Sequence, residues 1–312
     1  MLLPLLLTLA CQEDDESEPD LQDRLNTQLT QIETYLSDNN ISVTKENGYF
    51  IETITENPSG NVASQGDIVL AYYELQTLDG DLVDEVSQAN GDDPETIPFI
   101  QDRIFLPIGL YDVISSMRAG EEVRVFLPFN RAYFDYERPN LIPAYSPIVL
   151  QLQIPDIISP AELKVRQNEQ IKAYLADNDL LPADSLRGGV YYHQEQAGGT
   201  PEVENQSIVS VRYSGTLLDG TQFDSNADAA NPFVVNMSEN GVIDGFKTAL
   251  LEMSQREEAV ALLPADQAYG EGVYVMPFTI TSDLIAGRLL PGTAALGTYS
   301  ILRFDLEVEA VN

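Results

Sequence analysis

Apolar residues recur at helical spacing in two places, near the start of the chain and just past its middle. One apolar stripe is formed by Leu25, Leu29, Ile32 and Leu36, at spacings of four, three and four positions. Just past the middle of the chain, the second helical stretch opens with Ser159-Pro160-Ala161-Glu162. These residues combine an N-cap residue, a proline at the first helical position and a glutamate that completes a capping box. The pattern predicts a helix ahead of each of two longer regions.

Those longer regions have strand character. VSVRYSGTLLDGTQFDS, from Val209, has Val and Tyr before an Asp-Gly turn and Phe after it, which indicates a β-hairpin. GVIDGFKTALLEM, from Gly241, carries apolar residues at helical spacing, whereas EEAVALLP, from Glu257, and YSILRFDLEVEAV, from Tyr299, alternate like strands with one solvated face. The pattern predicts a mostly antiparallel sheet with one short helix across it, an α+β fold.

These elements occur twice. QIETYLSDNNI, from Gln31, matches QIKAYLADNDL, from Gln170, at an offset of 139 residues. Further matches, at offsets of 140, 136 and 154 residues, are Tyr73 with Tyr213, Tyr133 with Tyr269, and Tyr145-Ser146 with Tyr299-Ser300. The order of the matches predicts two duplicated domains, each with its own core and leading helix, over residues 24–157 and 158–312. The growth of the offset from 136 to 154 predicts an insertion of 18 residues in the second copy, within 271–295.

The first residues have the character of an export signal. Residues 2–10, LLPLLLTLA, are uncharged and too short to span a bilayer, but have the length of the apolar part of a secretory signal. Leu7-Thr8-Leu9-Ala10-Cys11 resembles a lipobox, so residues 1–11 are expected to hold a signal and a lipidated Cys11. Residues 12–23, with seven acids and no base, are expected to form an acidic tether. The prediction is an outer-membrane lipoprotein on the periplasmic or cell-surface face.

Composition narrows the classes of partner and chemistry. With 50 acidic and 16 basic residues, the net charge of −34 repels phosphate backbones and anionic lipid, so we expect no nucleic acid and no membrane contact except through the lipid anchor. One cysteine and one histidine allow no internal disulfide and no Cys/His zinc site. We expect neither a cofactor nor a metal.

The second copy carries a series of short motifs in a fixed order. They are Tyr213 and Gly215, Asp219-Gly220, Phe223-Asp224-Ser225, Val242-Ile243-Asp244-Gly245, Ala268-Tyr269-Gly270 and Phe304-Asp305-Leu306-Glu307. In order and spacing, over about 100 residues, they resemble the FKBP class of peptidyl-prolyl isomerases. The duplication, lipobox and leading helices make the whole chain similar to tandem-domain FKBP-type lipoproteins of the Bacteroidetes, including the gliding-associated type.

The resemblance implies two FKBP-like domains and a proline pocket in the second. The implied catalytic residues are Tyr213, Phe223, Asp224, Phe233, Val242, Ile243, Phe246, Tyr269 and Phe304. Ile243 is expected to donate its backbone N–H, and Tyr269 its hydroxyl, to substrate carbonyls, with Asp224 as a buried polar group at the rim. Proline-containing polypeptides are the implied clients, and macrolide immunosuppressants are candidate ligands.

Such a pocket needs no nucleophile, metal or acid–base pair. Rotation about an X-Pro bond faces a barrier of about 18–20 kcal/mol because the amide is resonance-stabilised. A twisted amide loses much of its charge separation, so a dry apolar pocket binds it better than the planar form. A thousandfold acceleration requires only about 4 kcal/mol of such differential binding.

The first copy keeps the predicted fold but not the full pocket. Tyr73, Asp84, Phe99, Tyr133 and Ile142-Pro143 survive, whereas Phe223, Phe246 and Phe304 are replaced by Val83, Leu110 and Leu150. At the position of Ile243 stands Pro107, which has no N–H to donate. We therefore expect activity in the second copy and a scaffold or weak binder in the first. The insertion is expected to cover the active site, extend it, or bind a partner.

The leading hypothesis is a prolyl isomerase that assists the folding of exported proteins. The alternative is a non-catalytic FKBP-like peptide-binding or chaperone lipoprotein, which a proline-peptide turnover assay separates from the enzyme. A surface glycan-binding lipoprotein is disfavoured because such sites usually present Trp, which this chain lacks.

The first testable prediction concerns Cys11. Because it follows a short apolar run and precedes an acidic segment, we expect loss of residues 1–10 and acylation of the new N-terminus. Intact mass of the native, membrane-extracted protein measures this, and an unmodified soluble chain that begins at Met1 would refute it.

Overall fold

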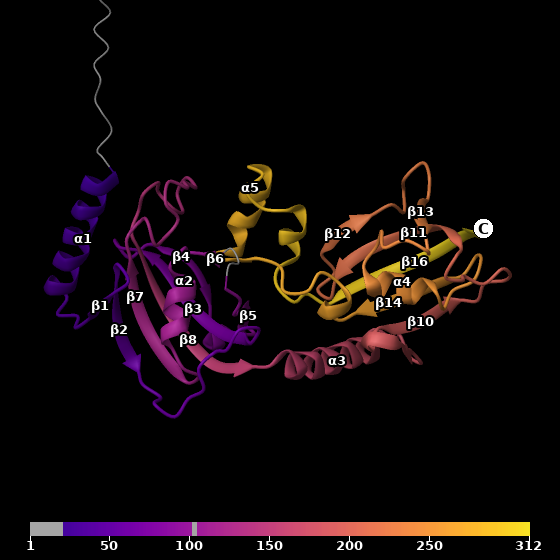
Figure 1. Ribbon diagram of the computed structural model, residues 1–312, viewed down its shortest axis with the longest axis horizontal. Coiled ribbons are helices and arrows are strands. Elements are labelled where there is room, and N and C mark those ends of the chain that lie inside the picture. The colour runs from indigo at the N-terminus through magenta and orange to yellow at the C-terminus, as the bar shows by residue number, and fades with distance from the viewer. Residues whose placement is uncertain (1–20, 102–104) are drawn as a thin grey trace, which may run out of the picture.

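The computed structural model describes residues 21–101 and 105–312, and within them the chain forms two domains side by side (Figure 1). Cys11 and residues 12–20 of the predicted tether lie outside the described residues. Among those described, no helix has both the length and the apolar character needed to cross a membrane.

The first domain opens with helix α1 (Leu21–Asp38) and builds one antiparallel sheet. Its strands are β1 (Thr44–Glu46), β2 (Tyr49–Thr55), β3 (Ile68–Thr77), β4 (Leu82–Val86), β5 (Glu95–Pro98), β7 (Glu121–Leu127) and β8 (Ile148–Ile158). The order in the sheet is β1-β2-β7-β8-β3-β4, with β5 also paired to β3. Helix α2 (Leu110–Ser116) packs its buried Leu110, Val113 and Ile114 into the main core cluster of this domain.

The second domain repeats this arrangement after helix α3 (Pro160–Asp177). Its strands are β9 (Asp184–Ser185), β10 (Tyr191–Gln196), β11 (Ile208–Leu217), β12 (Gln222–Ser225), β13 (Phe233–Asn236), β14 (Glu258–Leu263) and β16 (Leu302–Val311). The order β12-β11-β16-β14-β10-β9, with β13 paired to β11, is that of the first sheet, and helix α4 (Asp244–Leu250) takes the place of α2. The predicted α+β class and the duplication of the domain are confirmed.

Local sequence explains several of these elements. The Asp-Gly hairpin turns form because Gly80 (φ +91°) and Gly220 (φ +88°) supply backbone conformations that other residues rarely adopt. At α3 the predicted capping box is present, since Ser159 Oγ accepts from the Glu162 N–H at 3.2 Å and Glu162 accepts from the Ser159 N–H at 2.8 Å.

The leading helices cover the outer face of each sheet, and a buried glutamine anchors each of them. In α3, Gln167 donates to the Tyr299 carbonyl at 2.7 Å and accepts from the Ala265 N–H at 3.0 Å. In α1, Gln28 makes the equivalent bonds to the Tyr145 carbonyl and the Phe129 N–H. The same bridge at both positions shows that the helices belong to the duplicated unit.

Two predictions from the pattern are wrong in detail. Strand β14 has no solvated face after Glu258, because α3 covers one side of it and the main core the other. Helix α1 begins at Leu21, so the last three residues of the predicted tether are helical; Asp23 lies in the first turn, where a negative charge stabilises the helix.

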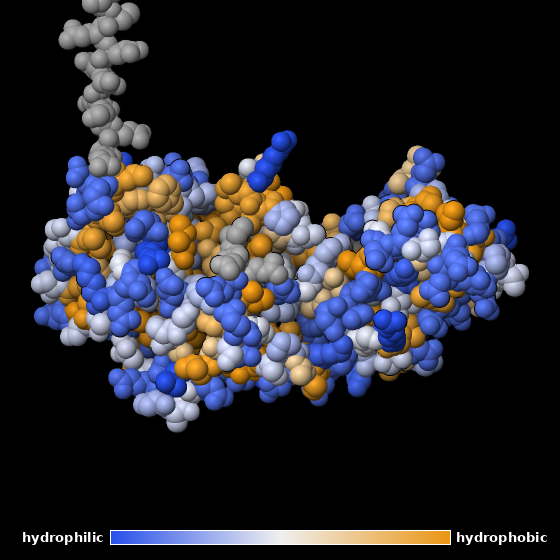
Figure 2. Space-filling view, in the orientation of Figure 1, coloured by the Kyte–Doolittle hydropathy of each residue, from blue (hydrophilic) through white to orange (hydrophobic). Residues whose placement is uncertain are grey.

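The two domains are connected twice. Strand β8 passes directly into α3 at Ser159, which forms the lower connection in Figure 1. The upper connection is the insertion, which contains β15 (Tyr274–Val275), the short helix α5 (Thr281–Ala286) and two short 3-10 segments, and lies against the first domain. Figure 2 shows apolar surface gathered where α5 meets that domain.

The glutamine bridge yields the second testable prediction. Gln167→Ala leaves the buried Ala265 N–H without its acceptor, so we expect a loss of about 1–3 kcal/mol in the free energy of unfolding. Urea denaturation measures it, with Gln170→Ala, an exposed position of the same helix, as the matched control. Equal effects of the two substitutions would contradict the proposed role of the bridge.

Candidate functional site

The second domain holds a small cavity of about 150 Å³ between its sheet and α4. It is lined by Tyr213, Asp224, Phe233, Gly241, Val242, Ile243, Phe246, Tyr269 and Phe304. Eight of the nine residues predicted from the sequence are thus brought together around one hollow. Gly241, which was not predicted, completes the lining, and Phe223 is not part of it.

Aromatic rings form the floor of the cavity. Phe246 and Phe304 are each only 4% exposed, and their rings meet edge to face with centroids 5.1 Å apart. Tyr213 packs edge-on against Phe246 at 5.6 Å and against Phe233 at 5.8 Å. Such T-shaped packing holds each ring in place, so the floor is preformed.

Phe223 supports the floor from behind. Its ring lies edge-to-face with Phe304 at 5.7 Å, and the backbone of Gly215 runs directly alongside. A Cβ at residue 215 would come within 2.7 Å of Phe223 and 3.0 Å of Phe304. Glycine at this position therefore makes room for the ring pair.

The polar groups lie at the rim. Tyr213 donates its hydroxyl to Asp224 at 2.7 Å, and the Asp224 residue is exposed, so the prediction of a buried carboxylate is wrong: the short strand β12 leaves it at the surface. Burial and the charge of Asp224 raise the pKa of Tyr269, so its hydroxyl stays protonated at neutral pH. Within the described residues, neither that hydroxyl nor the Ile243 N–H donates a hydrogen bond to the chain, so both are available to a ligand.

The equivalent position of the first domain has different side chains on the same backbone. Tyr73 donates to Asp84 at 2.6 Å, as Tyr213 does to Asp224. Leu75 and Leu150, which pair across β3 and β8, stand where Gly215 and Phe304 pair across β11 and β16. Both leucines are fully buried, so aliphatic side chains take the positions that a glycine and a ring take in the second domain.

Phe99 is not the counterpart of Phe233, although the sequence comparison treated it as a surviving pocket residue. Strand pairing aligns Glu95, opposite Ala71, with Phe233, opposite Val211, so a carboxylate replaces that ring. Phe99 instead matches Met237, because their N–H groups donate to the equivalent Asp67 and Ser207 carbonyls. The sequences between β4 and β5 and between β12 and β13 differ in length, which hid this shift.

A comparison with protein-family profiles agrees with this architecture. The profile described as FKBP-type peptidyl-prolyl cis-trans isomerase matches residues 60–154 and again residues 199–308, which together make up more than half of the chain. The chain belongs to the FKBP-type peptidyl-prolyl isomerase family.

Relatives of known name share parts of the chain. It is 29% identical over 131 residues to FK506-binding protein 2 of Dictyostelium discoideum, an alignment that covers 42% of this chain and 84% of that protein. It is 36% identical over 99 residues to the outer membrane protein MIP of Legionella longbeachae, covering 31% of this chain and 42% of that protein. Among solved structures, FkpA from Escherichia coli is 24% identical, with 49% of this chain and 63% of that chain covered and a TM-score of 0.36.

The insertion does not cover the pocket of its own FKBP domain. It crosses to the first FKBP domain, where β15 pairs in parallel with β6 (Phe105–Leu106) and Tyr133 donates its hydroxyl to the Met276 carbonyl. Contact with the other FKBP domain of the same chain was not among the three roles considered from the sequence.

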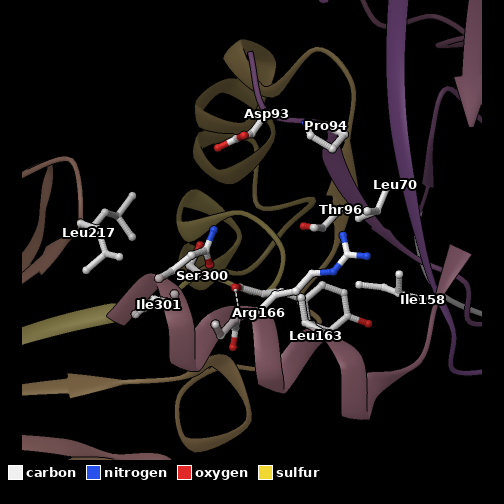
Figure 3. Close-up of a pocket in the computed structure, with 14 residues that line it drawn as sticks. Leu70, Asp93, Pro94, Thr96, Ile158, Leu163, Arg166, Leu217, Ser300 and Ile301 are labelled. Atoms are coloured by element: carbon white, nitrogen blue, oxygen red, sulfur yellow. Dashed lines mark hydrogen bonds between the residues drawn. The ribbon is translucent and has the colours of Figure 1, made fainter. Parts of the chain in front are cut away.

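A second hollow, of about 450 Å³, lies between the two FKBP domains above α3 (Figure 3). Leu70, Thr96 and Ile158 line it from the first domain, and Leu217 and Ile301 from the second. Arg166 crosses it from α3 and is held by Asp156 at 2.9 Å. In the described part of the chain, no three His, Cys, Asp or Glu side chains gather as metal ligands, in this hollow or elsewhere.

The third testable prediction uses Gly215. Gly215→Ala forces Phe223 and Phe304 apart, so we expect a loss of about 1–3 kcal/mol in the free energy of unfolding and a disturbed aromatic near-UV spectrum. Ser214→Ala, one residue away in β11, is the matched control, for which a change within about 0.5 kcal/mol is expected. An unchanged spectrum in Gly215→Ala would show that the ring pair does not depend on this glycine.

Proposed function

We propose that the second FKBP domain carries the isomerase activity of this chain and that the first does not. The observation that supports this most directly is a difference between two equivalent tyrosines. Tyr269 faces an open cavity, whereas the hydroxyl of Tyr133 is already bonded to a backbone carbonyl of the chain itself. A prolyl substrate therefore finds a free donor only in the second domain.

The cavity suits the chemistry of amide rotation. A proline ring resting on Phe246 and Phe304 is removed from water, which favours the less polar twisted amide over the planar one. The Ile243 N–H and the Tyr269 hydroxyl lie at the cavity and can hold the carbonyls on either side of the rotating bond. The groups act by positioning and by exclusion of water, and no proton is transferred.

We also propose that the substrates are exported polypeptides and that Cys11 anchors the enzyme to the outer membrane. The lipobox resemblance and the acidic segment after it support this, as does the similarity to a relative named as an outer membrane protein. A Cys11→Ser chain is expected to leave the membrane fraction while its turnover of a soluble peptide stays unchanged.

A peptide-binding role without catalysis is the second candidate. The observation that favours it is the extended segment held by the first domain, which shows that this fold holds a peptide strand in this chain. Turnover of a proline peptide by the full chain decides between the two roles.

The fourth testable prediction divides the work between the domains. Tyr269→Phe removes one aligned donor and is expected to lower kcat/KM a few-fold to about tenfold. Phe304→Leu, which copies Leu150 of the first domain, removes apolar contact with the proline ring and is expected to cost about tenfold or more. A protease-coupled assay on the full chain measures both.

Tyr133→Phe is the matched control, because it alters the equivalent hydroxyl of the first domain. We expect it to change turnover by less than about twofold, since that hydroxyl bonds to Met276 rather than to a substrate. Equal losses in Tyr133→Phe and Tyr269→Phe, or full activity of Phe304→Leu, would show that the site is misplaced.

A further inference from the structure

The insertion enters the first domain as an extended strand. Tyr274 pairs with Phe105 and Val275 with Leu106, and the Met276 N–H donates to the Leu106 carbonyl at 3.0 Å. The partner strand β6 is the counterpart of Gly241-Val242, which lines the open cavity of the second domain. The segment therefore lies on the backbone that would flank a ligand in the other copy.

The side chains of the segment fill the equivalent hollow. Tyr274 is 4% exposed and belongs to the core of the first domain. Burial, with the nearby charges of Glu95 and Asp84, raises the pKa of its phenol, which places the ring beside the carboxylates that mark this hollow. Tyr133 completes the site by donating to the Met276 carbonyl.

The backbone of this groove presents a hydrogen-bond acceptor rather than a donor, which limits the peptides that it can bind. Pro107 stands where Ile243 presents its N–H in the second domain, so the first groove offers the Leu106 carbonyl instead. The bound strand must then supply an N–H, as Met276 does, and a proline at that position cannot bind in this way. The first groove thus requires a residue with an N–H at this position, and the proline of the bound segment, Pro277, follows one residue later.

Contacts beyond the strand lengthen the interface. Ile280 and Leu284 of the insertion are at most 4% exposed and belong to the core of the first domain. Tyr136 donates to Asp283 at 2.9 Å, and Arg138 donates to the Thr279 carbonyl at 2.6 Å and lies 3.7 Å from Asp283. An apolar centre with a polar rim is the arrangement of a specific binding interface.

We propose that the first FKBP domain is a peptide receptor whose ligand is residues 273–284 of its own chain, and that this ligand closes the groove to other polypeptides. The ligand class is an extended apolar segment that places a tyrosine in the hollow and offers a backbone N–H two residues later. The proposal concerns the first domain and does not depend on isomerase activity in the second.

The test uses a fluorescent peptide with the sequence of residues 272–284, GVYVMPFTITSDL, and the full chain. The wild-type chain should bind it weakly, because a tethered ligand competes at an effective concentration of about a millimolar. In a Tyr274→Ala/Ile280→Ala chain the groove is vacated, and anisotropy should show binding about 10²-fold tighter or more than in the wild type.

Two further variants identify the groove that is used. Tyr133→Phe in the vacated chain should weaken peptide binding a few-fold, whereas Phe304→Leu, in the other domain, should not change it. Leu289→Ser is the matched control, because Leu289 lies in the same insertion but is 68% exposed. A chain that carries only Leu289→Ser should bind the peptide as weakly as the wild type does.

The outcomes that overturn the proposal are distinct. They are equal affinity of the wild-type and vacated chains, no binding by a vacated chain whose circular dichroism is native, or sensitivity to Phe304→Leu rather than to Tyr133→Phe. If the double variant does not fold, Asp283→Asn, which alters only the rim, should still admit the peptide a few-fold more tightly than the wild type, and no gain there overturns the proposal. A wild-type dimer that exchanges this segment between chains would overturn the assignment to the same chain.

Discussion

The pairing of Tyr274–Met276 with Phe105–Leu106 is the contact on which the arrangement of the two domains depends. It satisfies backbone groups of both partners at a place where each would otherwise face an open hollow. It also lets Met276, Ile280 and Leu284, which have no core of their own to enter, become buried in the first domain. The insertion is thereby packed on the surface of the first domain that corresponds to the pocket of the second.

The two pockets show how one fold diverges without losing its packing. Gly215 with Phe304 in one copy corresponds to Leu75 with Leu150 in the other, so the loss of a ring is matched by the gain of a side chain on the facing strand. Both leucines are fully buried, so this pair of positions stays apolar and packed in both copies. The Tyr–Asp hydrogen bond at the rim is retained in both copies, since it holds the hairpin in place whether or not the hollow binds a substrate.

Sequence patterns predicted what is locally determined. The Asp-Gly hairpins, the capping box at Ser159 and the ring of aromatic residues around Phe304 follow from spacing and from family motifs, and each is present. The partner of the insertion was not predictable, because its apolar residues show what must be buried but not where. The structural equivalence of Glu95 and Phe233 was also hidden from the sequence. The loops before these residues differ in length, which changes the spacing between the two copies, and only the strand pairing shows that the positions correspond.

The pairing of β15 with β6 also bears on how the open pocket of the second domain is oriented. A single linker such as the β8–α3 junction would permit rotation, but the insertion joins the domains at a second place, on the other side of the hollow that α3 underlies (Figure 1). Thr298 bonds to Thr96 where the insertion returns, and Leu163 and Tyr299 pack on Ile68, Leu70 and Ile158. Two separated attachments oppose the hinge motion that is the default for domains joined by a small interface. The orientation of the Phe246–Phe304 pocket relative to the first domain therefore depends on both attachments, and the segment held by the first domain is one of them.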